Sequence, residues 1–358
     1  MYILGIMSGS SLDGLDMALC SFEESSEADL NWEIIHTEAI DFPVELKQGL
    51  SRCSRMSVRE LKELEVRFSI FCSKTINSLN LDVPIDFIAS HGHTVIHHPK
   101  DGYSLQIGSG AIIAELTGIS TICDFRANDI ALGGQGAPVA PIVEQLLFKG
   151  YDFYINLGGI ANVSVHQEDK IKSWDSVPCN QVLNHYAKLV GEDYDDKGQL
   201  ARKGRLHEGL LTAWLDLPYF HQAHPKSLDN DWVQNEFISV AKQFNIETND
   251  ILKTMVEVCA KQLALDMTPY TTEEEDTRKC LITGGGAHND FLVERLSDIL
   301  SGFHVDVVKP NVELINYKEA VLMALMGYLR ANHKENTISS VTGARSNTIG
   351  GCVYRSGM

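Results

Sequence analysis

The chain has 358 residues, of which 44% are hydrophobic, and a formal net charge of −18 at pH 7. This length exceeds one comfortable hydrophobic core, so we expect two domains. The acidic balance argues against nucleic acid or an anionic membrane as partner. No apolar run is long enough to span a membrane, and the apolar start of the chain lacks a basic region. The eight cysteines form no C-x-x-C pair, which favours reduced thiols and a cytoplasmic location.

The opening of the chain predicts two strands joined by a Gly- and Ser-rich turn. Apolar residues at 3–6 and 17–22 flank the stretch Gly5–Asp16, a pattern typical of a hairpin. Amides and hydroxyls of such a turn can face a phosphate, and Asp13 and Asp16 supply carboxylates suited to Mg²⁺. An ordinary Gly-rich hairpin explains the stretch about as well. The turn has neither a Walker A motif nor a dinucleotide fingerprint.

A third strand near 32–37 and an amphipathic helix follow. The helix begins at a capping box, Ser57-x-x-Glu60, and apolar residues then recur at spacings of three and four. Strands are expected at 87–90, 104–107 and 119–123, and a helix at 111–116. Polar residues follow the strands that end at Ser90 and Cys123. In open α/β sheets ligands collect at such strand ends.

Four histidines follow the strand 87–90, at positions 91, 93, 97 and 98. No matching ligand group occurs elsewhere and positions 97–98 are expected in a loop, so hydrogen bonding of a substrate hydroxyl by His91 or Thr94 is favoured over zinc. Arg126 follows a buried strand, where an unpaired guanidinium is costly. Its partner is either a structural carboxylate or an anionic substrate group such as a carboxylate.

A Gly-rich stretch at 131–138 precedes a helix expected at 139–148, and we place a domain boundary at 135/136, with Gly133–Gly136 as a candidate flexible joint. The opening pattern then returns at 153–165 as strand, Gly turn and strand. This repetition indicates a weak internal duplication, in which Gly158, Gly159 and Asn162 of the second hairpin face a nucleotide. Chance similarity between two Gly-containing hairpins is the alternative.

The second half is more helical, with helices expected at 177–190, 206–215, 232–244 and 250–267. A strand at 279–283 enters a triple-glycine turn, Gly284–Asn289, and then a helix to about residue 300. A strand, a glycine turn and a helix N-terminus can hold a nucleoside or a phosphate, although a plain strand-to-helix turn has the same pattern. A last apolar helix at 318–330 opens with Glu319, an acid that suits the helix dipole.

Asp175 lies at the end of the expected third strand of the second half. A carboxylate near the γ-phosphate of a nucleotide can deprotonate an attacking water or hydroxyl. Taken alone, a surface aspartate is the more frequent situation.

Six motifs, in order along nearly the whole chain, together resemble the anhydro-N-acetylmuramic acid kinases, within the actin-like sugar kinase, Hsp70 and acetate kinase group. They are GIMSGSSLDGLD (5–16), SHGHTV (90–95), FRANDIALGGQGAP (125–138), INLGGIANVS (155–164), GGGAHN (284–289) and SSVTGA (339–344).

The resemblance implies an α/β fold of two ribonuclease-H-like, actin-like ATPase domains, 1–135 and 136–358, with ATP and Mg²⁺ in the cleft between them. The last segment of the chain is free to pack back on the first domain. The implied reaction opens 1,6-anhydro-N-acetylmuramic acid with water, transfers the γ-phosphoryl of ATP to O6, and gives N-acetylmuramic acid 6-phosphate for cell-wall recycling. The expected partner is this small sugar, with no nucleic acid or membrane, and a homodimer is left open.

Site residues follow from the resemblance as well. Asp175 matches the aspartate that activates water. The cofactor side comprises Gly9, Ser10, Ser11, Leu12, Asp13, Gly14, Leu15, Asp16, Gly158, Gly159, Asn162, Gly284, Gly285, Gly286 and Asn289, with Asp13 as a Mg²⁺ ligand. The sugar side comprises His91, Thr94, Arg126, Asp129 and Glu319.

The chain departs from the family pattern around its aspartate. The family usually has Asp-Thr-Gly-Pro-Gly-Asn, whereas this chain has Asp-Ser-Val-Pro-Cys-Asn at 175–180, and His93 replaces a usual Gln. Val177 is β-branched where glycine freedom is usual. Two alternatives therefore stand beside the anhydro-sugar kinase: a kinase of the same fold for another amino sugar or hexose, and a non-catalytic ATP-binding module with chaperone-like movement.

Overall fold

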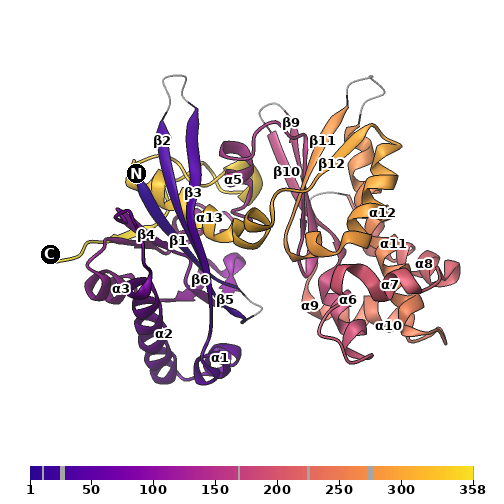
Figure 1. The fold of residues 1–358 in the computed structure, drawn as a ribbon, viewed down its shortest axis with the longest axis horizontal. Coiled ribbons are helices and arrows are strands. Elements are labelled where there is room, and N and C mark those ends of the chain that lie inside the picture. The colour runs from indigo at the N-terminus through magenta and orange to yellow at the C-terminus, as the bar shows by residue number, and fades with distance from the viewer. Residues whose placement is uncertain (10–11, 25–28, 168–169, 224–225, 272–276, 358) are drawn as a thin grey trace. The chain divides into compact units, whose positions relative to one another are not determined.

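A computed structural model describes the chain apart from residues 10–11, 25–28, 168–169, 224–225, 272–276 and 358. It divides into two compact units, Met1–Lys149 with Tyr317–Met358, and Gly150–Asn316 (Figure 1). The first unit continues past the boundary expected at 135/136 and takes back the last segment of the chain. No described helix is long and apolar enough to cross a membrane.

The first unit contains a six-stranded mixed sheet in the order β13-β7-β4-β1-β2-β3, and β5 and β6 form a separate hairpin. Strand β2 runs antiparallel to both β1 and β3, whereas β4 lies parallel to β1 and β7 parallel to β4. The strands are β1 (Tyr2–Ser8), β2 (Gly14–Glu24), β3 (Leu30–Asp41), β4 (Phe87–Ser90), β5 (His93–His98), β6 (Tyr103–Ile107), β7 (Thr121–Cys123) and β13 (Cys352–Tyr354).

Side-chain alternation along β1 sends apolar residues to both faces of this sheet. Leu4 and Ile6 belong to a core that includes Phe68 of α2, and α2 begins at the predicted capping box. On the other face α13 lies so close that a Cβ at Gly5 would fall 1.9 Å from the carbonyl oxygen of Ala320. The helices of this unit are α1 (Val44–Ser51), α2 (Val58–Ser78), α3 (Gly110–Thr117), α4 (Ala127–Ala131), α5 (Pro141–Leu146), α14 (Ser339–Thr342) and α13 (Val312–Ala331), which begins in the second unit.

The second unit repeats the strand order of the first. Its sheet runs β10-β9-β8-β11-β12, which matches β3-β2-β1-β4-β7 strand for strand and direction for direction. This is the ribonuclease-H-like order, so the predicted duplication is confirmed at the level of topology. The strands are β8 (Phe153–Leu157), β9 (Ile160–Gln167), β10 (Lys170–Pro178), β11 (Arg278–Thr283) and β12 (Val305–Val308).

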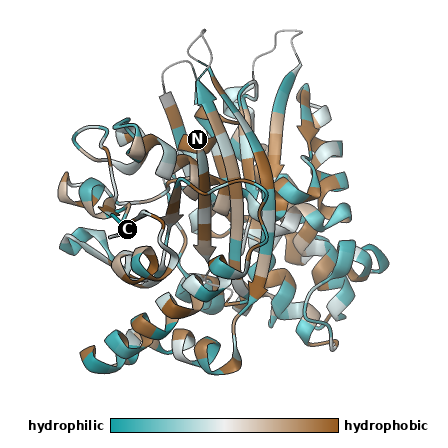
Figure 2. Ribbon diagram, turned by 60° about the vertical axis from the view of Figure 1, so that its left-hand side comes forward, coloured by the Kyte–Doolittle hydropathy of each residue, from teal (hydrophilic) through white to brown (hydrophobic). Residues whose placement is uncertain are grey.

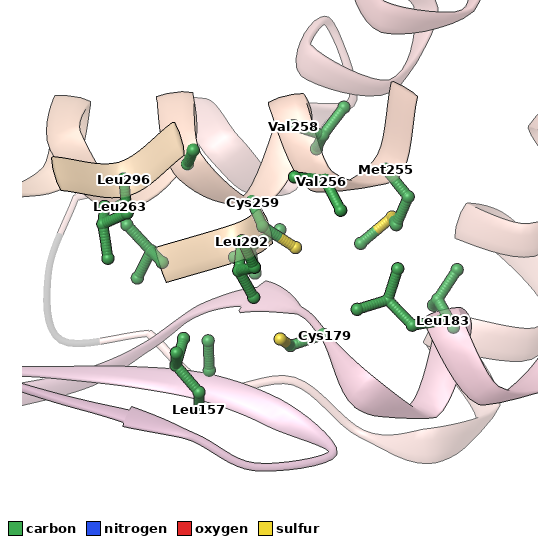
Figure 3. Close-up of a cluster of buried hydrophobic side chains, with 14 of the residues drawn as sticks. Leu157, Cys179, Leu183, Met255, Val256, Val258, Cys259, Leu263, Leu292 and Leu296 are labelled. Carbon is green, nitrogen blue, oxygen red and sulfur yellow. The ribbon is translucent and has the colours of Figure 1, made fainter. Parts of the chain in front are cut away.

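Helix α11 lies at the centre of the second core. Figure 3 shows its residues Met255, Cys259 and Leu263 facing Leu157 of β8 and Cys179, all fully buried. In Figure 2 the strands are largely hydrophobic, whereas the helices alternate between hydrophobic and hydrophilic residues. The helices are α6 (Asn180–Lys188), α7 (Gln199–Lys203), α8 (Glu208–Leu215), α9 (Asn230–Trp232), α10 (Ile238–Ala241), α11 (Thr248–Met267) and α12 (Asp290–Ser301).

Three sequence-based predictions of elements are wrong. Val177 lies in a strand rather than beginning a helix, because β10 continues to Pro178 with a register shift beside Asp175. Residues 97–98 lie in β5, not in a loop. The last helix begins at Val312, where Asn311 accepts the Leu314 amide at 2.8 Å, so Glu319 lies well inside the helix and does not face the dipole of its first turn.

The stretch expected to be a flexible joint is fixed within the first unit. The Gln135 amide donates to the carbonyl of Thr342 at 2.9 Å, and a Cβ at Gly134 would fall 2.2 Å from Oδ2 of Asp129. Glycine is therefore needed at position 134 for close packing, and hinge motion at Gly133–Gly136 stays a prediction.

The close approach of α13 to β1 predicts the effect of Gly5→Ala. Because the new methyl would collide with helix backbone, we expect a loss of about 1–3 kcal/mol in the free energy of unfolding, measured by urea denaturation. Gly357→Ala is the control, since a Cβ there meets only the end of the Glu115 side chain at 3.7 Å. Equal stability of the two variants would contradict the packing described.

Candidate functional site

Two glycine turns lie next to each other in the second unit, at the carboxyl ends of β8 and β11. These strands are parallel, with Asn156 opposite Thr283. A Cβ at Gly284, whose φ is +83°, would fall 2.9 Å from the carbonyl of Leu157. Asn180 closes the arrangement by donating from Nδ2 to the same carbonyl at 2.9 Å. Parallel strand ends thus bring together the two turns that the sequence places more than a hundred residues apart.

A pocket of about 610 Å³ opens beside the triple-glycine turn. Gly285 is exposed, and a Cβ there would meet only Asn180 at 3.9 Å, so the backbone of this turn faces open space. Most of the other lining residues come from α6 and from the 194–197 segment, and Lys309 belongs to the wall as well. The lining residues are Asn180, Leu183, Asn184, Tyr194, Asp195, Asp196, Lys197, Gly285, Gly286, His288, Asn289, Asp290, Lys309 and Val312.

The walls of this pocket are held by hydrogen bonds of their own. Asn289 caps α12, because its Oδ1 accepts the Leu292 amide at 3.0 Å. Asp195 is buried and its two carboxylate oxygens accept the amides of Leu200 and Ala201 at 2.7 and 2.9 Å. Asn289 therefore shapes the pocket through the helix it caps. The opposite wall was visible in the sequence only as a cluster of acidic residues, which gave no signal of a pocket.

Asp175 occupies the other candidate centre of the second unit, on β10. Its Oδ1 accepts a short hydrogen bond from Nδ2 of Asn162 on β9, and its Oδ2 accepts the amide of Leu228 at 2.8 Å. The side chain remains partly exposed. Burial raises the pKa of Asp175, whereas the Leu228 and Asn162 hydrogen bonds lower it. A carboxylate made more basic and fixed at both oxygens suits a proton acceptor.

A β-bulge in β10 lies directly after Asp175. The register against β9 shifts between Asp175 and Val177, so Ser176 is the extra residue. Ser176 is fully buried and its Oγ has no hydrogen-bond partner in the described part of the chain. Bulges of this kind often redirect a side chain near a functional site.

Three carboxylates lie close together in the first unit. Asp16 of β2 is half-buried, and burial together with the charges of Glu319 and Asp13 raises its pKa to about 6. Asp13 and Glu319 are exposed to solvent, and carboxylates that repel one another fit a divalent cation. Among the residues that the structure describes, however, no group of three or more His, Cys, Asp or Glu side chains is arranged to hold a metal directly.

The other residues of the first turn, which the sequence predicts to bind the cofactor, differ in how far they are buried. Leu15 is in the core, and Gly14 is pressed against β3, where a Cβ would fall 2.3 Å from the carbonyl of Ile40. Leu12 has a φ of +59° and donates its amide to Gly9 at 3.3 Å. The predicted ligands Ser10 and Ser11 lie outside the described residues.

Buried His91 and half-buried Arg126 form a pair beyond the ends of β4 and β7. His91 Nδ1 lies 3.1 Å from the carbonyl of Gly92, so it carries the proton, and Nε2 accepts from Nη2 of Arg126 at 2.9 Å. Burial and the Arg126 charge lower the pKa of His91 to about 3. His91 is therefore neutral. Arg126 Nη1 donates to the carbonyl of Gly136 at 2.9 Å.

Arg126 thus keeps binding capacity. Of its five N–H groups, one on each terminal nitrogen has no protein acceptor in the described residues, and no described carboxylate pairs with it directly. Burial lowers the pKa of Arg126, and the charge of Glu319 acts in the opposite direction. Between the two alternatives posed by the sequence, this geometry favours an anionic ligand over a structural carboxylate.

Asp129 is fully buried. Its Oδ1 accepts the hydroxyl of Thr342, and its Oδ2 accepts the amide of Gly136, both at 2.7 Å. Asp129 therefore fixes the loop whose carbonyl holds Arg126, and reaches a ligand only through that loop. Of the remaining predicted residues, Thr94 is half-buried in β5, and His93 binds the Oγ of Ser8 at 3.0 Å, at the end of β1.

The repeated strand order places the chain in the class of two-unit α/β proteins with the ribonuclease-H-like sheets of actin-like ATPases. Residues 1–356 match the family described as "Anhydro-N-acetylmuramic acid kinase", and the chain belongs to this family. It is accordingly an enzyme, a phosphotransferase with an alcohol group as acceptor, and a sugar kinase of cell-wall recycling.

Relatives of the same name are similar over their whole length. The protein from Sulfurovum sp. (strain NBC37-1) is 33% identical, with 98% of each chain covered. That from Mannheimia succiniciproducens is 31% identical, covering 99% of this chain and 98% of its own. Among solved structures, the activator of the 2-hydroxyisocaproyl-CoA dehydratase from Clostridium difficile with bound ADPNP aligns with a TM-score of 0.45 at 14% identity, covering 93% of this chain and 96% of its own.

The raised pKa of Asp16 predicts a pH-dependent gain in stability for Asp16→Asn. The folded protein binds more protons than the unfolded chain between pH 3.8 and about 6, so stability falls as the pH rises through this window and the penalty is complete above it. We expect the variant to be more stable than the parent by about 1–3 kcal/mol at pH 7.5 and equal to it near pH 4, as measured by urea denaturation. A difference that stays constant with pH would contradict the clustering of charges.

Proposed function

We propose that this chain opens 1,6-anhydro-N-acetylmuramic acid with water and transfers the γ-phosphoryl group of ATP to O6, giving N-acetylmuramic acid 6-phosphate. The observation that carries the proposal is Asp175, a partly exposed carboxylate of raised pKa held at both oxygens. A cytoplasmic location, where ATP is available, belongs to the same proposal.

In the proposed reaction Asp175 accepts the proton of a water whose oxygen bonds to the anomeric carbon. The bond from that carbon to O6 breaks, and O6 takes the γ-phosphoryl group as ADP leaves. The alcohol leaving group of one step is thus the acceptor of the other. Because the anomeric carbon and O6 belong to the same bound sugar, catalysis depends mostly on positioning and on neutralisation of charge.

Arg126 is the group we assign to the carboxylate of the muramic acid. Its two remaining N–H groups lie on the two terminal nitrogens, the arrangement that binds a carboxylate by two parallel hydrogen bonds. His91 supports this role as a neutral acceptor, because a protonated imidazole would repel the guanidinium. Thr94 and Glu319 are assigned to sugar hydroxyls, and Asp129 to the support of Arg126 through Gly136.

The pocket beside Gly284–Asn289 is assigned to the nucleoside, and Gly158, Gly159 and Asn162 to the same nucleotide. Its volume of about 610 Å³ is within the range of small-molecule sites. In the first unit, Gly9–Asp16 are assigned to the phosphates, and Asp13 and Asp16 to Mg²⁺. Magnesium usually binds through one or two carboxylates, waters and substrate phosphates, which fits carboxylates that form no metal site by themselves. Bound there, it would neutralise phosphate charge.

The family departures give no specific support to another sugar. Val177 and Cys179, which replace the usual glycines, are both fully buried. They change the core beneath Asp175 rather than a surface that a ligand touches.

The assignment of the base predicts the effect of Asp175→Asn. We expect kcat to fall about 10²–10⁴-fold, because the amide cannot accept the proton of water, with KM for ATP unchanged. The measurement is ADP and phosphosugar release with 1,6-anhydro-N-acetylmuramic acid, Mg²⁺ and ATP. Asp231→Asn, at an exposed position of the same unit, is the control. Full activity of Asp175→Asn would overturn the mechanism, and an inert, folded, ATP-binding parent enzyme would overturn the substrate.

The assignment of Arg126 predicts a loss of substrate binding in Arg126→Lys. A hydrogen bond to a charged group contributes about 1.5–3 kcal/mol, so KM for the sugar should rise about 10–100-fold. The same substitution should change KM little for a substrate whose carboxylate has been converted to an amide. If both substrates lose affinity equally, Arg126 does not bind the carboxylate.

A further inference from the structure

One short segment makes three bonds to Asp175. The Tyr219 hydroxyl donates to the backbone carbonyl of Asp175 at 2.6 Å. The amide of Asp175 donates to the carbonyl of Lys226 at 3.1 Å, and the amide of Leu228 donates to Oδ2 at 2.8 Å. The position of the carboxylate therefore depends on how the described parts of segment 219–228, which are residues 219–223 and 226–228, are held against β10.

Lys226 holds this segment through its buried side chain, which is only 2% exposed. The ammonium lies 3.5 Å and 3.4 Å from the carbonyl oxygens of Tyr219 and Phe220, and 4.8 Å from the centre of the Tyr219 ring. It also lies 3.9 Å from Oδ1 of Asp266. A lysine charge is rarely buried without such partners. Lys226 thus joins the two ends of the segment that contact Asp175.

Asp266, the partner of Lys226 on α11, is itself fixed by two hydrogen bonds. Its Oδ2 accepts the indole N–H of Trp174 at 3.0 Å, and its Oδ1 accepts the side-chain amide of Gln262 at 2.9 Å. Trp174 directly precedes Asp175 on β10. Helix α11 is therefore tied both to the strand that carries Asp175 and to the segment that binds its carboxylate.

We propose that Lys226 is a positioning residue for the reaction, which keeps the Asp175 carboxylate in place by tying the described parts of segment 219–228 to Asp266. The inference rests on the proposed role of Asp175 as the base. A buried ion pair contributes little net stability compared with apolar residues of similar size. The contacts of Lys226 with Tyr219 and Phe220 instead indicate that it places the Asp175 carboxylate.

The test is a double-mutant cycle between Lys226→Met and Asp175→Asn, measured by single-turnover formation of phosphosugar. A misplacement of about 1 Å can lower a rate about 10²-fold, so we expect Lys226→Met to lower the rate about 10–100-fold, with KM for ATP within about twofold. In the Asp175→Asn background the same substitution should cost nothing further, because the group being placed is already absent. Lys226→Arg should restore part of the activity.

The pH profile gives a readout that general destabilisation would not change. The Leu228 amide lowers the pKa of Asp175, so loss of that bond should move the acidic limb of the kcat profile to higher pH. The ionisable groups of this network are the Tyr219 phenol, Lys226 and Asp266.

Tyr219→Phe keeps the test decisive if Lys226→Met does not fold, because it removes one hydroxyl and leaves the packing. We expect it to lower the rate about 3–10-fold in the parent and not at all in Asp175→Asn. Equal losses in both backgrounds, or no loss in the parent, would overturn the inference. Full activity of Asp175→Asn would instead overturn the proposed base.

Discussion

Partial burial of a carboxylate is the constraint on which the second unit depends. Burial raises the pKa of Asp175, whereas a hydrogen-bond donor at each carboxylate oxygen lowers it and favours the charged form. One donor comes from the neighbouring strand, at Asn162, and the other from a distant segment, at Leu228. The bulge at Ser176 lies next to the carboxylate on β10. The Leu228 donor depends on the described parts of segment 219–228, which Lys226 links to Asp266 of α11.

The first unit meets a related constraint in a different way. Arg126 has to keep its charge in a half-buried position, and a carboxylate partner would use the N–H groups that a ligand needs. A neutral histidine avoids this, because one ring nitrogen accepts from the guanidinium while the other donates to a carbonyl. The pKa of His91 near 3 keeps that state constant over the physiological range.

The features that the sequence predicted well are local ones. Strand, turn and strand at residues 3–22 and 153–165 follow from apolar runs around glycine, and α2 follows from its capping box and its apolar spacing. The duplication, read from two similar hairpins, is confirmed because the remaining strands follow in the same order. Catalytic and binding assignments remain predictions, since they depend on a bound ligand.

What the sequence could not show is the set of contacts between distant residues. The bond from Thr342 to Asp129 and the pair of Lys226 with Asp266 leave no local pattern in the chain. For the same reason, no local pattern in the sequence predicts the pocket wall at 194–197. The sequence predicts the start of the last helix too late, because Asn311, a good N-cap, lies outside the apolar run that signals the helix.

The departures from the family pattern at 177 and 179 are best understood as a change of core packing. Val177 and Cys179 are fully buried, and Cys179 lies against Cys259 of α11, whose Sγ is 3.4 Å from the carbonyl of Pro178. Protein interiors are close-packed, so side chains in place of glycines require matching space on the opposite helix. Cys259 and Ala260 provide two small side chains on α11. Because α11 also carries Asp266, the same helix that accommodates the larger residues holds the segment that binds Asp175, and the carboxylate can keep its place while the core beneath it differs.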